Sequence, residues 1–130
     1  MDEISFKKPR TLIVEDDPGH QRLIELYLKR AGCVCDFAFD GKSGLKKATA
    51  EDYDIIFMDL NIPEMDGFMV ATLLREQGNQ TPMVAVTALE IEGVKRKANM
   101  VGYNDFLAKP FEQSAIVALL EKYFPGHIQR

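Results

Sequence analysis

Six polar side chains that could bind a cation or a phosphoryl group stand directly after apolar runs of the sequence. They are Glu15, Asp16, Asp17, Asp59, Thr87 and Lys109. Carboxylate oxygens suit Mg²⁺, which takes one or two carboxylates and keeps several waters. A carboxylate can also accept a phosphoryl group, and a hydroxyl or an ammonium can bind the oxygens of that group. The residue types therefore predict metal-assisted phosphoryl chemistry, provided that the fold brings them together.

Asp59 is the candidate for the reacting carboxylate. The run IIFM at 55–58 is apolar throughout and stops at Asp59, a pattern typical of a strand buried on both faces. Aspartate is rarely buried unless it is paired or binds a metal. A cation would keep neighbouring carboxylates ionised. Asp59 could then attack phosphorus, with the cation, Lys109 and Thr87 stabilising the phosphoryl oxygens.

Each of these residues also has a purely structural explanation. Asp59 could be a turn residue, because aspartate favours turns. Asp17 precedes Pro18 and fits a helix cap better than a metal ligand. Thr87 could be an ordinary strand residue, and Phe106, which lies in the run DFLAK that ends at Lys109, could belong to the core. Their joint placement at strand ends, and no single residue, indicates a shared site.

The elements that must position these side chains alternate between strand and helix. Apolar runs predict strands at 11–15, 34–39, 54–58, 82–88 and 105–109. Helical spacing and stop signals predict helices at 18–32, 41–53, 67–78, 90–102 and 111–124. Strict alternation predicts an α/β fold with a parallel sheet covered by helices on both faces. In such folds ligands bind beyond the carboxyl ends of the strands.

Bulk properties limit the function classes. A length of 130 residues fits one domain, and a net charge of −4 argues against direct nucleic-acid binding. No apolar run approaches the ~20 residues of a membrane span, so we expect a cytoplasmic protein without membrane contact. Cys33 and Cys35 are too few for a disulfide framework and are expected to be reduced thiols of a strand.

The motifs LIVEDD, IIFMDLNIPEMDGF, PMVAVTA and DFLAKPF resemble those of the receiver domain of two-component response regulators. The chain is similar to the chemotaxis response regulator in this respect. The resemblance covers residues 10–125, with a polar tail at 1–9, a short tail at 126–130 and no effector domain. It implies a flavodoxin-like (βα)5 doubly wound sheet of strand order 2-1-3-4-5.

The resemblance also implies a metal site. Asp59 resembles the phosphorylated aspartate of the family. Asp16 resembles a direct Mg²⁺ ligand, Glu15 an acid that acts through water, and Asn61 a residue that offers its backbone carbonyl. Mn²⁺ or Ca²⁺ are expected substitutes.

Four further positions match the family pattern. Thr87 and Lys109 resemble the residues that sense the phosphoryl group. Phe106 matches an aromatic switch position and, lacking a hydroxyl, would act by packing alone. Pro110 is expected to follow a cis peptide bond.

The implied function is a phosphorylation-controlled switch and not an enzyme. A histidine kinase or histidine phosphotransfer protein would donate the phosphoryl group. A downstream protein would bind the face formed by residues 90–102, 105–109 and 111–124, and the resemblance also allows a phosphorylation-dependent dimer.

Three alternatives remain open from the sequence. One is a receiver-like scaffold that acts without phosphorylation. A second is a phosphatase of the haloacid dehalogenase type, but that class has an acid two residues after the nucleophile, where this chain has Asn61. A third is a flavodoxin-type binder, which would need a glycine- and hydroxyl-rich loop in place of EDDPGH.

Overall fold

The computed structural model of the chain describes residues 8–60, 66–88 and 91–128, without the side chains of 91 and 92. Within this part, strands and helices alternate along the chain. They are β1 (Arg10–Val14), α1 (Pro18–Arg30), β2 (Val34–Ala38), α2 (Gly41–Ala50), β3 (Ile55–Asp59), α3 (Gly67–Glu76), β4 (Met83–Thr87), α4 (Ile91–Val101), β5 (Asp105–Ala108) and α5 (Gln113–Tyr123).

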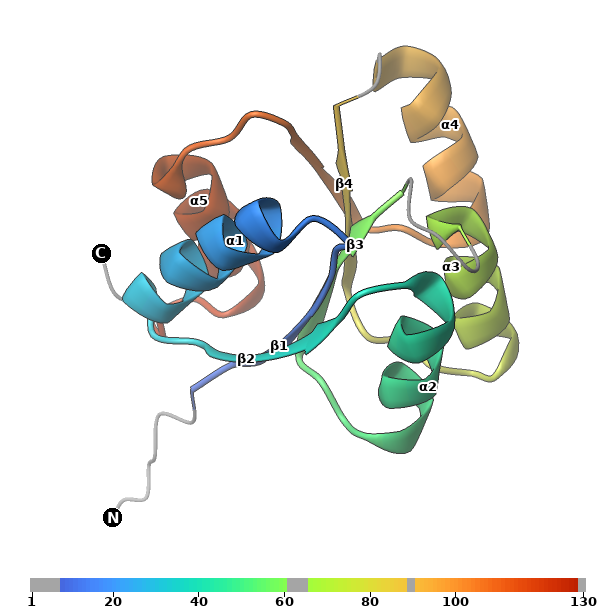
Figure 1. Cartoon of the computed structure of the whole chain (residues 1–130), viewed down its shortest axis with the longest axis horizontal. Helices are drawn as coiled ribbons and strands as arrows, with labels where there is room; N and C mark the ends of the chain where they lie inside the picture. Colours follow the sequence, from blue (N-terminus) through green and yellow to red (C-terminus); the bar gives the residue numbers. More distant parts are fainter. Residues whose placement is uncertain (1–7, 61–65, 89–90, 129–130) are drawn as a thin grey trace.

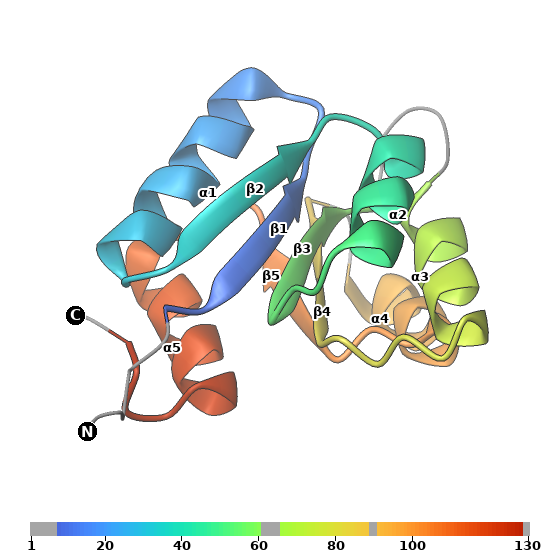
Figure 2. The ribbon, with the colours of Figure 1, turned by 90° about the horizontal axis from the view of Figure 1, so that it is seen from below.

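The strands form one parallel sheet in the order β2-β1-β3-β4-β5. Helices α1 and α5 cover one face of the sheet, and α2, α3 and α4 cover the other (Figures 1 and 2). This confirms the predicted flavodoxin-like fold and its strand order. Searched over the described residues, no helix has the length and apolar composition that crossing a bilayer requires.

Two apolar cores, one on each face, explain why the inner parts of β1, β3 and β4 are apolar. Side chains alternate between the faces of a strand. In β1, Leu12 and Val14 join the core under α2, α3 and α4, whereas Ile13 joins the core under α1 and α5. All three are fully buried, with 0% exposure. The sheet is therefore held between two helical layers, which leaves its edges as the places where polar chemistry can occur.

Aspartate caps begin three of the helices at the carboxyl edge of the sheet. The carboxylate of Asp17 accepts hydrogen bonds from the backbone N–H groups of Gly19 and His20. Asp40 and Asp66 cap α2 and α3 in the same way. Such caps satisfy backbone donors that the first turn leaves unpaired. The interpretation of Asp17 as a cap is thus confirmed.

Each helix ends before the residue that the sequence predicted, and two of the shifted boundaries have identifiable causes. Helix α2 ends at Ala50 instead of continuing to 53, because Glu51 is extended and Tyr53 is buried, with its hydroxyl donating to Asp36 over 2.8 Å. Helix α5 begins at Gln113, two residues later than expected. The residues between Pro110 and Gln113 therefore belong to the loop that follows β5.

Gly44 lets α2 approach β1 closely, which gives a test of the packing. A Cβ at this position would lie 2.8 Å from Cγ2 and 3.0 Å from Cγ1 of Val14, a stiff β-branched side chain in the core. We expect Gly44→Ala to lower the free energy of unfolding by about 1–3 kcal/mol in urea titrations. Gly93→Ala is the matched control.

The control should change stability in the opposite direction. A Cβ at Gly93, within α4, meets no atom within 4 Å. Alanine there should raise the free energy of unfolding by up to about 1 kcal/mol, because it favours the helix. If Gly44→Ala were as stable as the wild type, the close packing of α2 against β1 would be wrong.

Candidate functional site

The parallel sheet brings four predicted side chains to its carboxyl edge. Glu15 follows β1 directly, Asp59 ends β3 and Thr87 ends β4. Lys109 follows β5, and its backbone N–H donates to the Thr87 carbonyl over 2.9 Å, which extends the strand pairing by one residue. Glu15, Asp59 and Thr87 are buried, with exposures of 1%, 8% and 5%. Residues far apart in sequence thus form one polar cluster at a buried edge.

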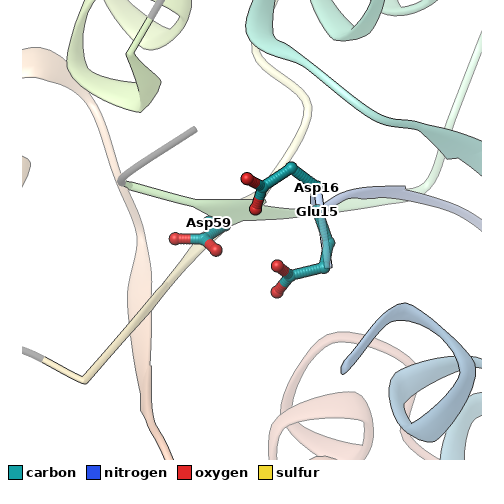
Figure 3. Close-up of side chains that lie close together, drawn as sticks. All are labelled: Glu15, Asp16 and Asp59. Carbon is teal, nitrogen blue, oxygen red and sulfur yellow. The ribbon is translucent and has the colours of Figure 1, made fainter. Parts of the chain in front are cut away.

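Three carboxylates of this edge lie close enough to share a cation. One oxygen from each of Glu15, Asp16 and Asp59 lies within 4.8 Å of the others, and Figure 3 shows these carboxyl groups gathered at the strand ends. Glu15 and Asp59 are buried, whereas Asp16 is exposed and open to solvent. All-oxygen donors with one solvent-facing side suit a hard divalent cation that keeps bound water. The residues therefore fit a divalent metal site.

Lys109 supplies a positive charge to this acidic edge. Its ammonium lies 2.9 Å from Glu15 Oε1 and 3.1 Å from Asp59 Oδ2, and its side chain is only 15% exposed. Burial by itself lowers the pKa of Lys109, but the hydrogen bond to Glu15 and the charge of Asp59 outweigh burial and raise the pKa above its ordinary value. Lys109 is therefore held as a cation in contact with Asp59.

Glu15 is the most buried of the acids and has a raised pKa. Burial is the largest cause, because it disfavours the charged form. The hydrogen bond from Lys109 acts in the opposite direction, and the neighbouring Asp59 raises the pKa further. The backbone N–H of Asp17 also donates to Glu15, over 3.2 Å. An ionised Glu15 is thus costly without a second cation, which a bound metal would provide.

Thr87 and Phe106 lie on the same face of the sheet. Ala85 pairs with Phe106 and Thr87 pairs with Ala108 in the register of β4 and β5, so Thr87 and Phe106 are diagonal neighbours. The half-buried Phe106 ring packs against the core under α2, α3 and α4. The Lys95 ammonium of α4 lies 5.6 Å from the ring centre, within the range of a cation–π contact. Phe106 therefore connects the polar edge with α4.

Two other predicted positions are Asn61 and Pro110. Asn61 lies outside the described residues, so its part as a metal ligand stays a prediction. The Lys109–Pro110 peptide bond is cis.

Sequence reasoning missed one residue that touches the cluster. His20 lies in the first turn of α1, and its Nδ1 is 3.3 Å from Lys109 Nζ. The signal was available, because a helix that begins after β1 at this edge places its first turn beside the strand ends.

Comparisons with known proteins agree with this geometry. The family model "Response regulator receiver domain" matches residues 11–121. The chain is 35% identical over 124 residues to the transcription factor prr1 of Schizosaccharomyces pombe, which covers 95% of this chain and 23% of that protein. It is 32% identical over 122 residues to the hybrid signal transduction histidine kinase F of Dictyostelium discoideum, covering 89% of this chain and 11% of that protein.

A solved structure provides the third comparison. It is the receiver domain of sensor histidine kinase PA1611 from Pseudomonas aeruginosa, with a magnesium ion coordinated in its active-site cleft. The TM-score is 0.82 at 32% identity, over 90% of this chain and 98% of that one. The chain spans less than a quarter of the length of the two curated relatives above. The chain belongs to the response regulator receiver domain family.

Proposed function

We propose that this chain is a phosphorylation-controlled switch in which Asp59 accepts a phosphoryl group from a phosphohistidine. The observation that carries the proposal is the ammonium of Lys109, which bridges Asp59 and Glu15 at a buried edge where a third acid, Asp16, also converges. A structural salt bridge needs only one acid, whereas two acids on one lysine with a third acid beside them leave negative charge for a divalent cation to neutralise.

Mg²⁺ is the cation we propose, with Mn²⁺ or Ca²⁺ as substitutes. Glu15, Asp16 and Asp59 would hold it, together with the backbone carbonyl of Asn61. When bound, Mg²⁺ would neutralise the acids and polarise the phosphoryl group. The solvent-facing side at Asp16 suits its preference for retained water.

The transfer step exchanges one bond to phosphorus for another. An Asp59 carboxylate oxygen attacks phosphorus and forms a P–O bond, while the P–N bond to the donor imidazole breaks and its electron pair stays on nitrogen. The released imidazole returns to its neutral form by binding a proton. Lys109 and Thr87 stabilise the oxygens of the phosphoryl group. The donor would be a histidine kinase or a histidine phosphotransfer protein.

The response is a change in population between two states of the face formed by α4, β5 and α5. Thr87 would move toward the new charge at Asp59, and Phe106, its diagonal neighbour, would turn inward. That turn would break the contact between the Phe106 ring and Lys95 of α4. A downstream protein or a second copy of the chain would bind the altered face.

Residues 10–125 are proposed as the functional unit, with 1–9 and 126–130 as tails. The chain would catalyse only its own phosphorylation and dephosphorylation, and would turn over no separate substrate. The domain would thus act as a signalling element.

Phosphoramidate tests the proposal without a cognate partner, because it carries the P–N bond of phosphohistidine. We expect the wild type to form a phosphoprotein that hydroxylamine cleaves, as it cleaves acyl phosphates, and to form it only while Mg²⁺ is present. Excess EDTA is the matched control. A phosphoprotein that resists hydroxylamine, or one that forms equally in EDTA, would contradict the proposal.

A further inference from the structure

The ammonium of Lys109 contacts three acceptors in the described part of the chain. Two are the carboxylates of Glu15 and Asp59, and the third is Nδ1 of His20, at 3.3 Å. An ammonium has three N–H donors and no acceptor. The Nδ1 atom must therefore be unprotonated in this arrangement and accept from Lys109. The three contacts together use every donor of Lys109.

His20 is held in place by the start of α1. Its backbone N–H donates to Asp17 Oδ1 over 3.1 Å, and Asp17 Oδ2 lies 4.0 Å from its Nδ1. The side chain of His20 is 53% exposed, so solvent reaches the ring. The ring thus lies beside Lys109 at the surface of the site.

Within the described part of the chain, a hollow beside His20 is lined mostly by uncharged residues. Its volume is about 340 Å³, and it is also lined by Leu23, Ala88, Lys109, Pro110 and Phe111. Among the described residues, the charged groups that face the ring are Asp17 from α1 and Lys109 from the loop between β5 and α5, and Lys109 links the ring to Glu15 and Asp59. A protonated ring would lie next to one cation and one carboxylate, with apolar space on its remaining side.

We propose that His20 is a positioning residue whose unprotonated Nδ1 holds the Lys109 ammonium against Asp59, so that phosphoryl uptake slows when the ring is protonated. This inference rests on the proposed function and adds a regulation of the same site. Protonation removes the acceptor and places two cations 3.3 Å apart. The ring then turns toward Asp17 or into the hollow, and Lys109 loses one of its three contacts. Histidine is the side chain that ordinarily changes charge near neutral pH.

Two substitutions separate the position of the acceptor from simple loss of the ring. In His20→Asn, the side-chain oxygen can take the place of Nδ1 and accept from Lys109 without titrating. In His20→Gln, the side-chain oxygen reaches the place of Nε2 instead, and from there it cannot accept a hydrogen bond from Lys109. Uptake from phosphoramidate would be timed by intact mass from about pH 5.5 to about pH 8. Ratios of variant to wild-type rates at each pH cancel the titration of the donor.

The expected pattern differs for each protein. Between the alkaline and acid ends, the wild type should slow by about three- to tenfold relative to His20→Asn, which is the size of one hydrogen bond. His20→Gln should be slow at every pH. Identical pH profiles of the wild type and His20→Asn, or equal rescue by glutamine, would overturn the inference. Melting temperatures of the variants check that they fold.

A second measurement tests the contact without phosphorylation. The Cε and Hε resonances of Lys109 should shift with pH by more in the wild type than in His20→Asn, in which the ring is gone. His127 follows the far end of α5, so His127→Asn should behave as the wild type. If the wild type took up no phosphoryl group, the proposed function would fail, and these resonances alone would decide whether His20 holds Lys109. Equal shifts in the wild type and in His20→Asn would overturn the inference by themselves.

Discussion

The Asp59→Asn variant is expected to take up no phosphoryl group under conditions that phosphorylate the wild type fully. An amide oxygen is a far weaker nucleophile than a carboxylate. Among the described residues, the other carboxylate in contact with Lys109 is that of Glu15, which follows β1. Intact mass after incubation with phosphoramidate and Mg²⁺ measures the result directly. The wild type should gain one phosphoryl mass, and the variant none.

Asp52→Asn provides the matched control. Asp52 is exposed and precedes β3, so it lies at the opposite end of the strand that Asp59 ends. This control should gain the phosphoryl mass at the wild-type rate. Asp59→Asn should remain folded and lose little stability, because it removes one of three carboxylates that repel each other without metal. A phosphorylated Asp59→Asn protein would place the acceptor elsewhere.

The Lys109→Met variant is expected to slow phosphoryl uptake by about ten- to a hundredfold. Removing one fixed donor to a developing oxyanion costs up to about 10²–10³ in rate in enzymes, and here a metal would share the charge. Lys122→Met is the control, because it removes another lysine–aspartate pair, at 2.8 Å from Asp105, on the exposed surface. Its rate should equal that of the wild type. Equal rates of phosphoryl uptake for both variants would show that Lys109 does not assist the reaction.

The same variant should lose stability in a way that depends on pH. Without Lys109, burial raises the pKa of Glu15 further, because the hydrogen bond that opposes burial is gone. A carboxyl with a higher pKa in the folded state makes that state bind more protons, so stability falls as pH rises through the folded pKa. Lys109→Met should therefore lose about 3 kcal/mol near neutral pH and less in acid.

Urea titrations with and without Mg²⁺ would measure this loss. Mg²⁺ should restore part of the stability of Lys109→Met, because a divalent cation replaces the missing counter-charge. A stability difference between variant and wild type that did not change with pH or with Mg²⁺ would show that Lys109 contributes only packing.

The sequence was sufficient to predict the polar edge because parallel strands end at one side of a sheet. The apolar runs before Glu15, Asp59 and Thr87 are uninterrupted, and such runs are difficult to explain except as strands buried on both faces. The cap formed by Asp17 was also predictable, because it uses only a local pattern of aspartate followed by proline. Both predictions use local patterns: an apolar run with the polar residue at its end, and an aspartate with the proline that follows it.

Contacts between distant segments could not be predicted in the same way. The approach of His20 to Lys109 joins α1 to the loop after β5, across 89 positions of sequence. Helix α5 begins late, at Gln113, because the preceding residues belong to the loop that positions Lys109. Helical periodicity in the sequence does not indicate this loop. The contact between Phe106 and Lys95 likewise depends on how α4 packs. Side-chain direction and tertiary packing decide all three.

Identification of the residue that carries the phosphoryl group is the decisive measurement for Asp59. Borohydride reduces an acyl phosphate of aspartate to homoserine, which tandem mass spectrometry locates in a peptide. After phosphorylation with Mg²⁺, we expect homoserine at position 59 and at no other aspartate. Homoserine at position 16 or elsewhere, or a phosphorylated protein in which no aspartate is reduced, would contradict the assignment of Asp59 as the acceptor.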